Sequence, residues 1–244
     1  MDRIEGRHPV IEAIKAGRPI EKILVAKQVR GRPIEELLKL AEEAGIRIQF
    51  VDRELLDRES EQKTHQGVIA VAAPKRFVDI DEIVEIARGR GEDPFVLILD
   101  GLEDPHNVGS LLRTAHAAGV HGVVMRERRA VGLTSTVAKV SAGAIEYVEI
   151  AQVVNLGQAI EQLKEKGLWV AGADMDGEPI YSTKLTGPLA VVIGAEGKGL
   201  SRLIREKCDF VVSLPMKGQV ASLNASVAGA LVLYEAVRQR LGQA

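Results

Sequence analysis

The stretch LPMKGQVASLNAS, at residues 214–226, follows an apolar run and leads into a segment rich in alanine, glycine and serine. Two other unusual stretches, DPHNVGSLLR at 104–113 and IGAEGKGL at 193–200, also begin where an apolar run ends. Open α/β sheets bind their ligands beyond the carboxyl ends of the strands. Three such loops in one part of the chain therefore predict a single site, built from backbone amides and a few polar side chains.

Composition limits the class of protein. The chain has 244 residues, 46% of them hydrophobic, which suffices for one or two domains with real cores. No apolar run reaches the roughly 18 residues of a membrane helix, and the first residues lack a secretory signal pattern. We therefore expect a cytoplasmic protein with no membrane segment. The single cysteine, Cys208, is predicted to be a packed thiol, and Trp169 is predicted to lie in the core. The five histidines have no metal-ligand spacing, so no metal site is expected.

Charge is unevenly distributed along the chain. The formal net charge is −2, but residues 1–76 have a balance of +2 and the remainder a balance of −4. Arg126, Arg128 and Arg129 form a basic group just after a predicted strand. Such a group can guide a phosphate backbone even on a mildly acidic protein, so these arginines are candidate RNA-binding residues. A solvated surface loop is the alternative interpretation.

The chain divides into two predicted domains, 1–73 and 94–244, joined by a charged linker at 74–93 with a helical piece. In the first domain, helices are expected around 10–14, 33–44 and 53–58, and strands at 22–26, 47–51 and 67–72. In the second, strands are expected at 95–99, 122–125, 147–150, 168–173, 189–193 and 210–213. Helices are expected there at 108–118, 135–140, 156–166, from about 201, and at 223–241. The continuous apolar strands imply a parallel sheet covered by helices on both faces.

The loop at 104–113 offers two candidate site residues. Val108, Leu111, Leu112 and Ala115 form a stripe that faces a core, while Arg113 lies on a neighbouring face of the same helix. Arg113 is therefore a cation presented to a cleft or a partner. Asn107 is either a site residue or simply the helix cap.

The other two loops suggest a ligand pocket. Three glycines surround Glu196, and glycine lets a backbone approach a ligand closely. The pattern fits neither a Walker A loop nor GxGxxG, and a turn without a ligand is the alternative. In the last loop, Ser222 or Asn224 could be the helix cap. Leu214, Met216 and Leu223 would add apolar surface suited to an aromatic heterocycle with a polar edge.

These three loops, in this order and spacing, resemble motifs 1, 2 and 3 of the SpoU/TrmH family of RNA ribose 2′-O-methyltransferases, within the SPOUT superfamily. The resemblance covers residues 94–244 and includes SAGA at Ser141–Ala144. GRHPVIEAI at Gly6–Ile14 and HQGVIA at His65–Ala70 resemble a small α/β, ribosomal-protein-L30e-like domain. That domain belongs to the 23S rRNA guanosine 2′-O-methyltransferase branch, where it binds the substrate.

The resemblance implies a fold and a set of functional residues. It implies a parallel sheet with a C-terminal trefoil knot, and a homodimer with active sites at the subunit interface. S-adenosylmethionine is expected against Gly194, Leu214 and Leu223, with Ile193 and Met216 beside them. The family's catalytic positions fall on Asn107, Arg113, Glu196, Ser222 and Asn224. The expected substrate is a guanosine in 23S rRNA.

The family's arginine at the position of Arg113 is proposed as a base, which is chemically awkward because a free guanidinium has a pKa above about 12. We expect Arg113 instead to bind the 3′-phosphate and stabilise the developing alkoxide, with Glu196 orienting it. The alternatives are a tRNA 2′-O-methyltransferase and a non-catalytic RNA-binding factor for ribosome assembly. A nucleotide-dependent α/β enzyme would need a phosphate loop that the sequence lacks.

Overall fold

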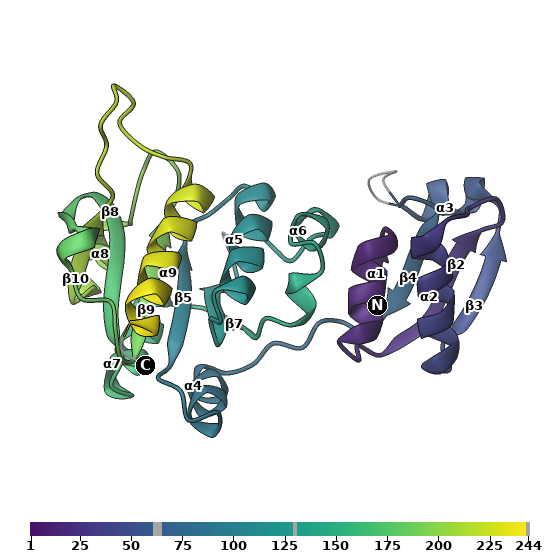
Figure 1. The fold of residues 1–244 in the computed structure, drawn as a ribbon, viewed down its shortest axis with the longest axis horizontal. Helices are drawn as coiled ribbons and strands as arrows, with labels where there is room; N and C mark the ends of the chain where they lie inside the picture. Colours follow the sequence, from purple (N-terminus) through teal and green to yellow (C-terminus); the bar gives the residue numbers. More distant parts are fainter. Residues whose placement is uncertain (61–64, 129–130, 243–244) are drawn as a thin grey trace. The chain divides into compact units, whose positions relative to one another are not determined.

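The computed structural model describes residues 1–60, 65–128 and 131–242. The chain forms two compact units, the first comprising residues 1–76 and 133–147 and the second comprising 77–132 and 148–244 (Figure 1). In the described residues, no helix is both long and apolar enough to cross a membrane. Each unit has its own sheet.

The first unit is built on a mixed sheet with strand order β1-β4-β2-β3. β4 is antiparallel to both β1 and β2, whereas β2 and β3 are parallel. The strands are β1 (Asp2–Glu5), β2 (Ile20–Ala26), β3 (Arg47–Val51) and β4 (Val68–Ala72). The helices are α1 (Arg7–Lys15), α2 (Arg32–Glu43), α3 (Arg53–Glu59), α6 (Ser135–Val140) and the 3-10 turn η1 (Ala144–Glu146).

The segment 133–147, far along the sequence, belongs to the first unit. Arg18 donates two hydrogen bonds, of 2.8 and 3.0 Å, to the carboxylate of Glu146, whose side chain is almost completely buried. Burial raises the pKa of Glu146, although Arg18 opposes that shift. Gly143, in the SAGA motif, has φ 87° and lies so close to Glu12 that a Cβ would clash with it. Close packing thus gives the motif a structural role in this unit.

The second unit is built on a six-stranded parallel sheet with strand order β10-β8-β9-β5-β6-β7. Its strands are β5 (Phe95–Asp100), β6 (Gly122–Arg126), β7 (Ile150–Val153), β8 (Trp169–Pro179), β9 (Leu189–Gly194) and β10 (Phe210–Ser213). Its helices are α4 (Ile80–Gly89), α5 (Pro105–Ala117), α7 (Leu156–Glu165), α8 (Arg202–Lys207) and α9 (Ala225–Leu241), with a 3-10 turn η2 (Ile180–Ser182).

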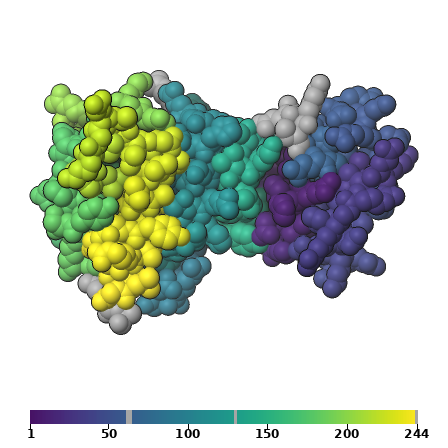
Figure 2. Space-filling view, turned by 45° about the horizontal axis from the view of Figure 1, so that its top comes forward, coloured from purple at the N-terminus to yellow at the C-terminus, as the bar shows by residue number. Residues whose placement is uncertain are grey.

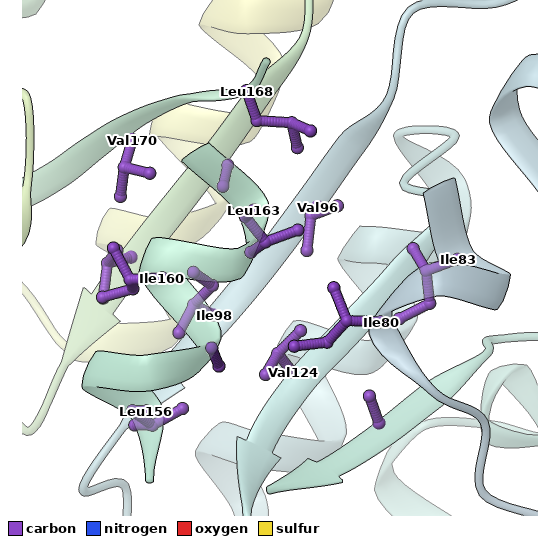
Figure 3. Packing of buried hydrophobic residues seen from close by; sticks show 14 of the residues in the cluster. Ile80, Ile83, Val96, Ile98, Val124, Leu156, Ile160, Leu163, Leu168 and Val170 are labelled. Atoms are coloured by element: carbon purple, nitrogen blue, oxygen red, sulfur yellow. The ribbon is translucent and has the colours of Figure 1, made fainter. Parts of the chain in front are cut away.

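Helices cover both faces of this sheet. On one face, residues of α4, α7 and α8 join a core with the strands, and Figure 3 shows Leu163 directed towards Val96, and Ile80 lying beside Val124. On the other face, α5 packs against α9. There Gly229 of α9 leaves no room for a side chain, because a Cβ would lie 2.5 Å from Leu111. The small residues of α9 therefore allow close helix packing.

Most of the predicted elements are confirmed, including the helical piece expected in the segment 74–93, which is α4. β1 was not predicted, β7 lies at 150–153 rather than 147–150, and β8 extends to residue 179 rather than 173. The prediction that Trp169 lies in the core is wrong, because the residue is 60% exposed at the first position of β8. Cys208 is packed against the core as predicted, and burial raises the pKa of its thiol to about 12. The trefoil knot stays a prediction, as do the domain boundaries.

The buried side chain of His121 should make the stability of the second unit depend on pH. The Nδ1 atom of His121 accepts a hydrogen bond from the Phe95 amide at 3.0 Å, so its Nε2–H is left to donate to Glu92 at 2.9 Å. Burial lowers the pKa of His121 below its usual value of 6.5. Neutral His121 therefore stabilises the fold fully above about pH 6.5, and this stabilisation is lost as the pH falls below it.

We expect the melting temperature of the protein to decrease between pH 7 and pH 5, and to decrease less steeply in a His121→Asn variant. Thermal unfolding followed by circular dichroism across this range measures both slopes. Equal slopes would show that His121 does not contribute to the pH dependence.

Candidate active site

The three loops of the sequence analysis meet at the carboxyl end of the second unit's sheet. β5 and β9 are neighbours, and Asp100 at the end of β5 pairs with Gly194 at the end of β9. The loop after β5 leads into α5, and the loop after β10 leads into α9, which packs against α5. Because parallel strands end at the same edge, the three loops come together there.

A hydrogen-bonded triangle of side chains joins the three loops. Asn107 donates to the Glu196 carboxylate at 3.2 Å, and Asn224 donates to the same oxygen at 3.0 Å. The Asn224 amide nitrogen also lies 2.9 Å from the carbonyl oxygen of Asn107. Asn107 is buried, whereas Glu196 is exposed, so the network lies where the core meets solvent. Two amides from separate loops thus hold one carboxylate oxygen in place.

Helix capping explains how the two asparagines are oriented. Asp104, not Asn107, caps α5, because its carboxylate accepts from the amide of His106 at 2.9 Å. Asn107 lies in the first turn, with its side chain free to reach Glu196. At the third loop, Asn224 is the cap of α9 and accepts from the amides of Ser226 and Val227. Its carbonyl oxygen faces the helix, and its amide nitrogen therefore faces Asn107 and Glu196.

A pocket lies beside this triangle, and we call it the donor pocket. Its empty volume is about 710 Å³, part of it open to solvent, and its walls come from β8, β9, α9 and the loops after β9 and β10. It is lined by Ala173, Asp174, Met175, Ile193, Gly194, Ala195, Glu196, Gly197, Gly199, Val212, Leu214, Met216, Ala221, Ser222, Leu223, Ala225, Ala228 and Val232. A mostly apolar lining with a few polar groups is typical of small-molecule sites.

The structure brings most of the predicted site residues together. Of the ten candidates for catalysis and cofactor binding, Asn107 belongs to the triangle without lining the donor pocket. Seven others line the donor pocket: Ile193, Gly194, Glu196, Leu214, Met216, Ser222 and Leu223. Asn224, like Asn107, belongs to the triangle and is not among the residues that line the pocket. Arg113 is exposed on α5 and is not among the described residues that line this pocket.

The structure describes two of the three arginines that were predicted to bind RNA. Arg126 ends β6, and one of its terminal nitrogens lies 3.4 Å from the buried carboxylate of Asp100. With Lys198, Glu103 and Asn107, it lines a second hollow on the other side of the Glu196 loop. Arg128 is exposed. Arg129 lies outside the described residues.

Sequence reasoning did not identify the contribution of β8. Ala173, Asp174 and Met175 line the donor pocket because β8 lies next to β9. The acidic pair Asp174 and Asp176, directly after an apolar run, was the signal that could have marked this strand as part of the site.

Comparison with known proteins identifies the family. Residues 94–234 match the SpoU rRNA Methylase family, and residues 3–78 match the family described as RNA 2′-O ribose methyltransferase substrate binding. The chain belongs to the SpoU/TrmH family. It is accordingly an S-adenosylmethionine-dependent RNA ribose 2′-O-methyltransferase.

Relatives of the SpoU/TrmH family match the chain along nearly all of its length. A Bacillus subtilis (strain 168) protein, YacO, provisionally named as a TrmH family tRNA/rRNA methyltransferase, is 47% identical over 98% of this chain and 96% of its own. The SpoU methyltransferase AviRb of Streptomyces viridochromogenes, solved in complex with AdoMet, has a TM-score of 0.82 at 26% identity, covering 98% of this chain and 90% of that one. A solved RNA 2′-O ribose methyltransferase has a TM-score of 0.77 at 28% identity, covering 98% and 88%.

The donor pocket has the chemistry that S-adenosylmethionine requires. Its apolar walls suit the adenine ring, and its backbone loops offer amides and carbonyls to the ring's polar edge. The carboxylates of Asp174 and Glu196 both line it, and negative charge favours a sulfonium cation over a neutral ligand. In the described residues, no group of three or more histidine, cysteine, aspartate or glutamate side chains is arranged to hold a metal.

Proposed function

We propose that this protein methylates the ribose 2′-hydroxyl of a guanosine in 23S rRNA, using S-adenosylmethionine held in the donor pocket. The triangle of Asn107, Glu196 and Asn224 beside that pocket is the observation that carries the proposal. A binding protein without catalysis would have no need for a carboxylate held by two amides from separate loops at the donor pocket. The substrate-binding domain at residues 3–78 supports a large folded RNA as substrate.

The proposed mechanism assigns distinct tasks to the chain's own residues. When bound, S-adenosylmethionine supplies a methyl group made labile by the sulfonium charge. The protein must then align the 2′-hydroxyl, let its proton leave to solvent, and stabilise the negative charge that develops on its oxygen. Arg113 is proposed to bind the adjacent 3′-phosphate and lower the cost of forming that charge. Glu196 orients Arg113, while Asn107, Ser222 and Asn224 hold the loops and the ribose. The backbone at Gly194, Leu214 and Leu223, with Ile193 and Met216, holds the donor.

The RNA substrate is the part of the proposal that an experiment decides most directly. Total rRNA and tRNA from cells with and without the gene would be mapped for 2′-O-methylation. Loss of one methylated guanosine in 23S rRNA supports the proposal. A missing methyl group in tRNA would instead establish the tRNA alternative. Unchanged RNA, with a purified protein that transfers no tritium from labelled donor to either RNA, would leave the non-catalytic assembly factor.

We further propose that the active protein is a homodimer that pairs through α9. Val227, Leu231 and Tyr234 follow one another at helical spacing and are 47%, 44% and 49% exposed. Figure 2 shows α9, in yellow, uncovered at the surface of the second unit. An exposed apolar stripe of this kind is typical of a protein interface. The stripe begins at Val227, three residues after the cap residue Asn224, so a second copy seated on it would lie close to the triangle.

A charge placed in this stripe is expected to separate the subunits. Leu231→Glu should convert the dimer to a monomer, because an unpaired carboxylate would be buried at the interface. Light scattering coupled to size-exclusion chromatography measures the mass. Leu203→Glu is the matched control, since Leu203 is 56% exposed on α8, on the opposite face of the sheet. A Leu231→Glu protein that stays dimeric would exclude this helix as the interface.

A further inference from the structure

The loop that carries Glu196 is held from both sides by carboxylates. Asp100, at the end of β5, accepts a hydrogen bond from the amide of Ser201 at 2.8 Å. Asp174, in β8, accepts one from the preceding amide, that of Leu200, at 3.3 Å. β5 and β8 are the two strands on either side of β9, from which the loop emerges. Successive amides at the end of the loop are therefore bound by the two flanking strands.

The two carboxylates are buried at a cost that their partners offset. Asp100 is only 3% exposed and Asp174 only 13%. Burying a carboxylate is unfavourable unless it is paired and hydrogen-bonded. Arg126 lies 3.4 Å from Asp100, and Arg205 lies 3.0 Å from Asp174. Each carboxylate that binds the loop is thus also paired with an arginine.

The segment between β9 and the two amides bound by Asp100 and Asp174 is a tight hairpin. Ala195 and Gly199 exchange two backbone hydrogen bonds, of 3.1 and 2.9 Å, and Glu196 lies in the turn between them. Gly199 packs directly against Asp174, where a Cβ would lie 2.8 Å from the carboxylate. Any movement of residues 199–201 would therefore move Glu196 away from Asn107 and Asn224.

We propose that Asp100 and Asp174 are positioning residues that clamp the loop and fix Glu196 for methyl transfer. The proposal rests on the proposed function, in which Glu196 takes part. The roles of the two residues can be tested separately, because only one of them lines the donor pocket. Asp174 lines the donor pocket, whereas Asp100 lines only the second hollow beyond the loop. Loss of Asp100 should thus affect the rate of transfer, and loss of Asp174 both the rate and the binding of the donor.

The test combines hydrogen exchange, donor binding and turnover. In Asp100→Ala, exchange of the amides in residues 194–201 should accelerate while exchange in β5 stays slow. The transfer rate at saturating donor should fall about 100-fold, because a displacement of about 1 Å is enough for such a loss. The donor Kd should stay nearly unchanged. Asp100→Asn should recover most of the rate, since its amide oxygen can still accept from Ser201.

Asp176→Ala is the matched control for Asp174→Ala. Asp176 pairs with the same arginine, Arg205, at 2.8 Å, but it is 77% exposed and belongs to neither the loop contacts nor the donor pocket. Asp174→Ala should accelerate loop exchange and raise the donor Kd, and Asp176→Ala should do neither.

A folded Asp100→Ala protein whose loop exchanges as slowly as the wild type would overturn the clamp. A loss of transfer rate in Asp100→Ala that is fully explained by a higher donor Kd would overturn it as well. Hydrogen exchange needs neither RNA nor donor. If the wild-type protein methylates no RNA while the exchange pattern holds, the proposed function fails and the clamp stands.

Discussion

Replacing Gly194 by alanine is expected to weaken binding of S-adenosylmethionine strongly without unfolding the protein. A Cβ at this position would lie 2.2 Å from the carbonyl oxygen of Gly199 and 2.6 Å from the amide of Leu200. Both neighbours are backbone atoms, so no side chain can rotate away. The loop must move, and its hairpin between Ala195 and Gly199 must open. Because this loop forms one wall of the donor pocket, the pocket is lost with it.

We expect the donor Kd of Gly194→Ala to rise on the order of 100-fold, which corresponds to about 2.8 kcal/mol. Isothermal titration calorimetry measures the affinity, and a melting curve establishes that the protein is folded. Gly218→Ala is the matched control, since Gly218 lies in the loop after β10 and a Cβ there would have nothing within 4 Å. Donor binding by Gly194→Ala at wild-type affinity would mean that S-adenosylmethionine does not bind against this loop.

Strands β5 and β9 show how far the sequence could predict the structure. FVLILD at 95–100 and LAVVIG at 189–194 are buried at every position, and continuous apolar runs of that length predicted both strands and their parallel sheet. Trp169 was misplaced because an apolar run does not indicate which of its residues lies where the strand begins. β7 was placed three residues early because its position is set by pairing with β6, from Val123 with Ile150 onward.

The site was predictable in its loops but not in its contacts. Unusual turns after strands marked the loops of Asn107, Glu196 and Asn224. The sequence could not show that both amides bind the same oxygen of Glu196, because that depends on how strands distant in sequence become neighbours. The order β10-β8-β9-β5 brings β8 to the side of β9, and this places Asp174 in the site. Local patterns carry no information on such a crossover.

Arg113 is the predicted catalytic residue that lies in neither the donor pocket nor the triangle of the described chain. Its position leads to the second prediction with a large effect. Arg113 is exposed on α5, whereas Glu196 lies at the pocket. In a homodimer with active sites at the interface, Arg113 would complete the site of the partner subunit. Arg113→Ala should then lower the rate of transfer on the order of 1,000-fold, the cost of removing one group that stabilises developing charge. Donor affinity should stay nearly intact.

A mixed dimer tests whether Arg113 acts across the interface. Arg113→Ala and Glu196→Ala subunits, carrying different tags, would be co-expressed and the mixed species purified. If Arg113 completes the partner's site, one of the two sites in each mixed dimer holds both residues, so about half of the wild-type activity should return. If Arg113 acts within its own subunit, every site lacks one group and the mixed dimer stays inactive. Arg113→Lys serves as the chemical control, because near-normal turnover with lysine would contradict planar, two-pronged binding of a phosphate by the guanidinium.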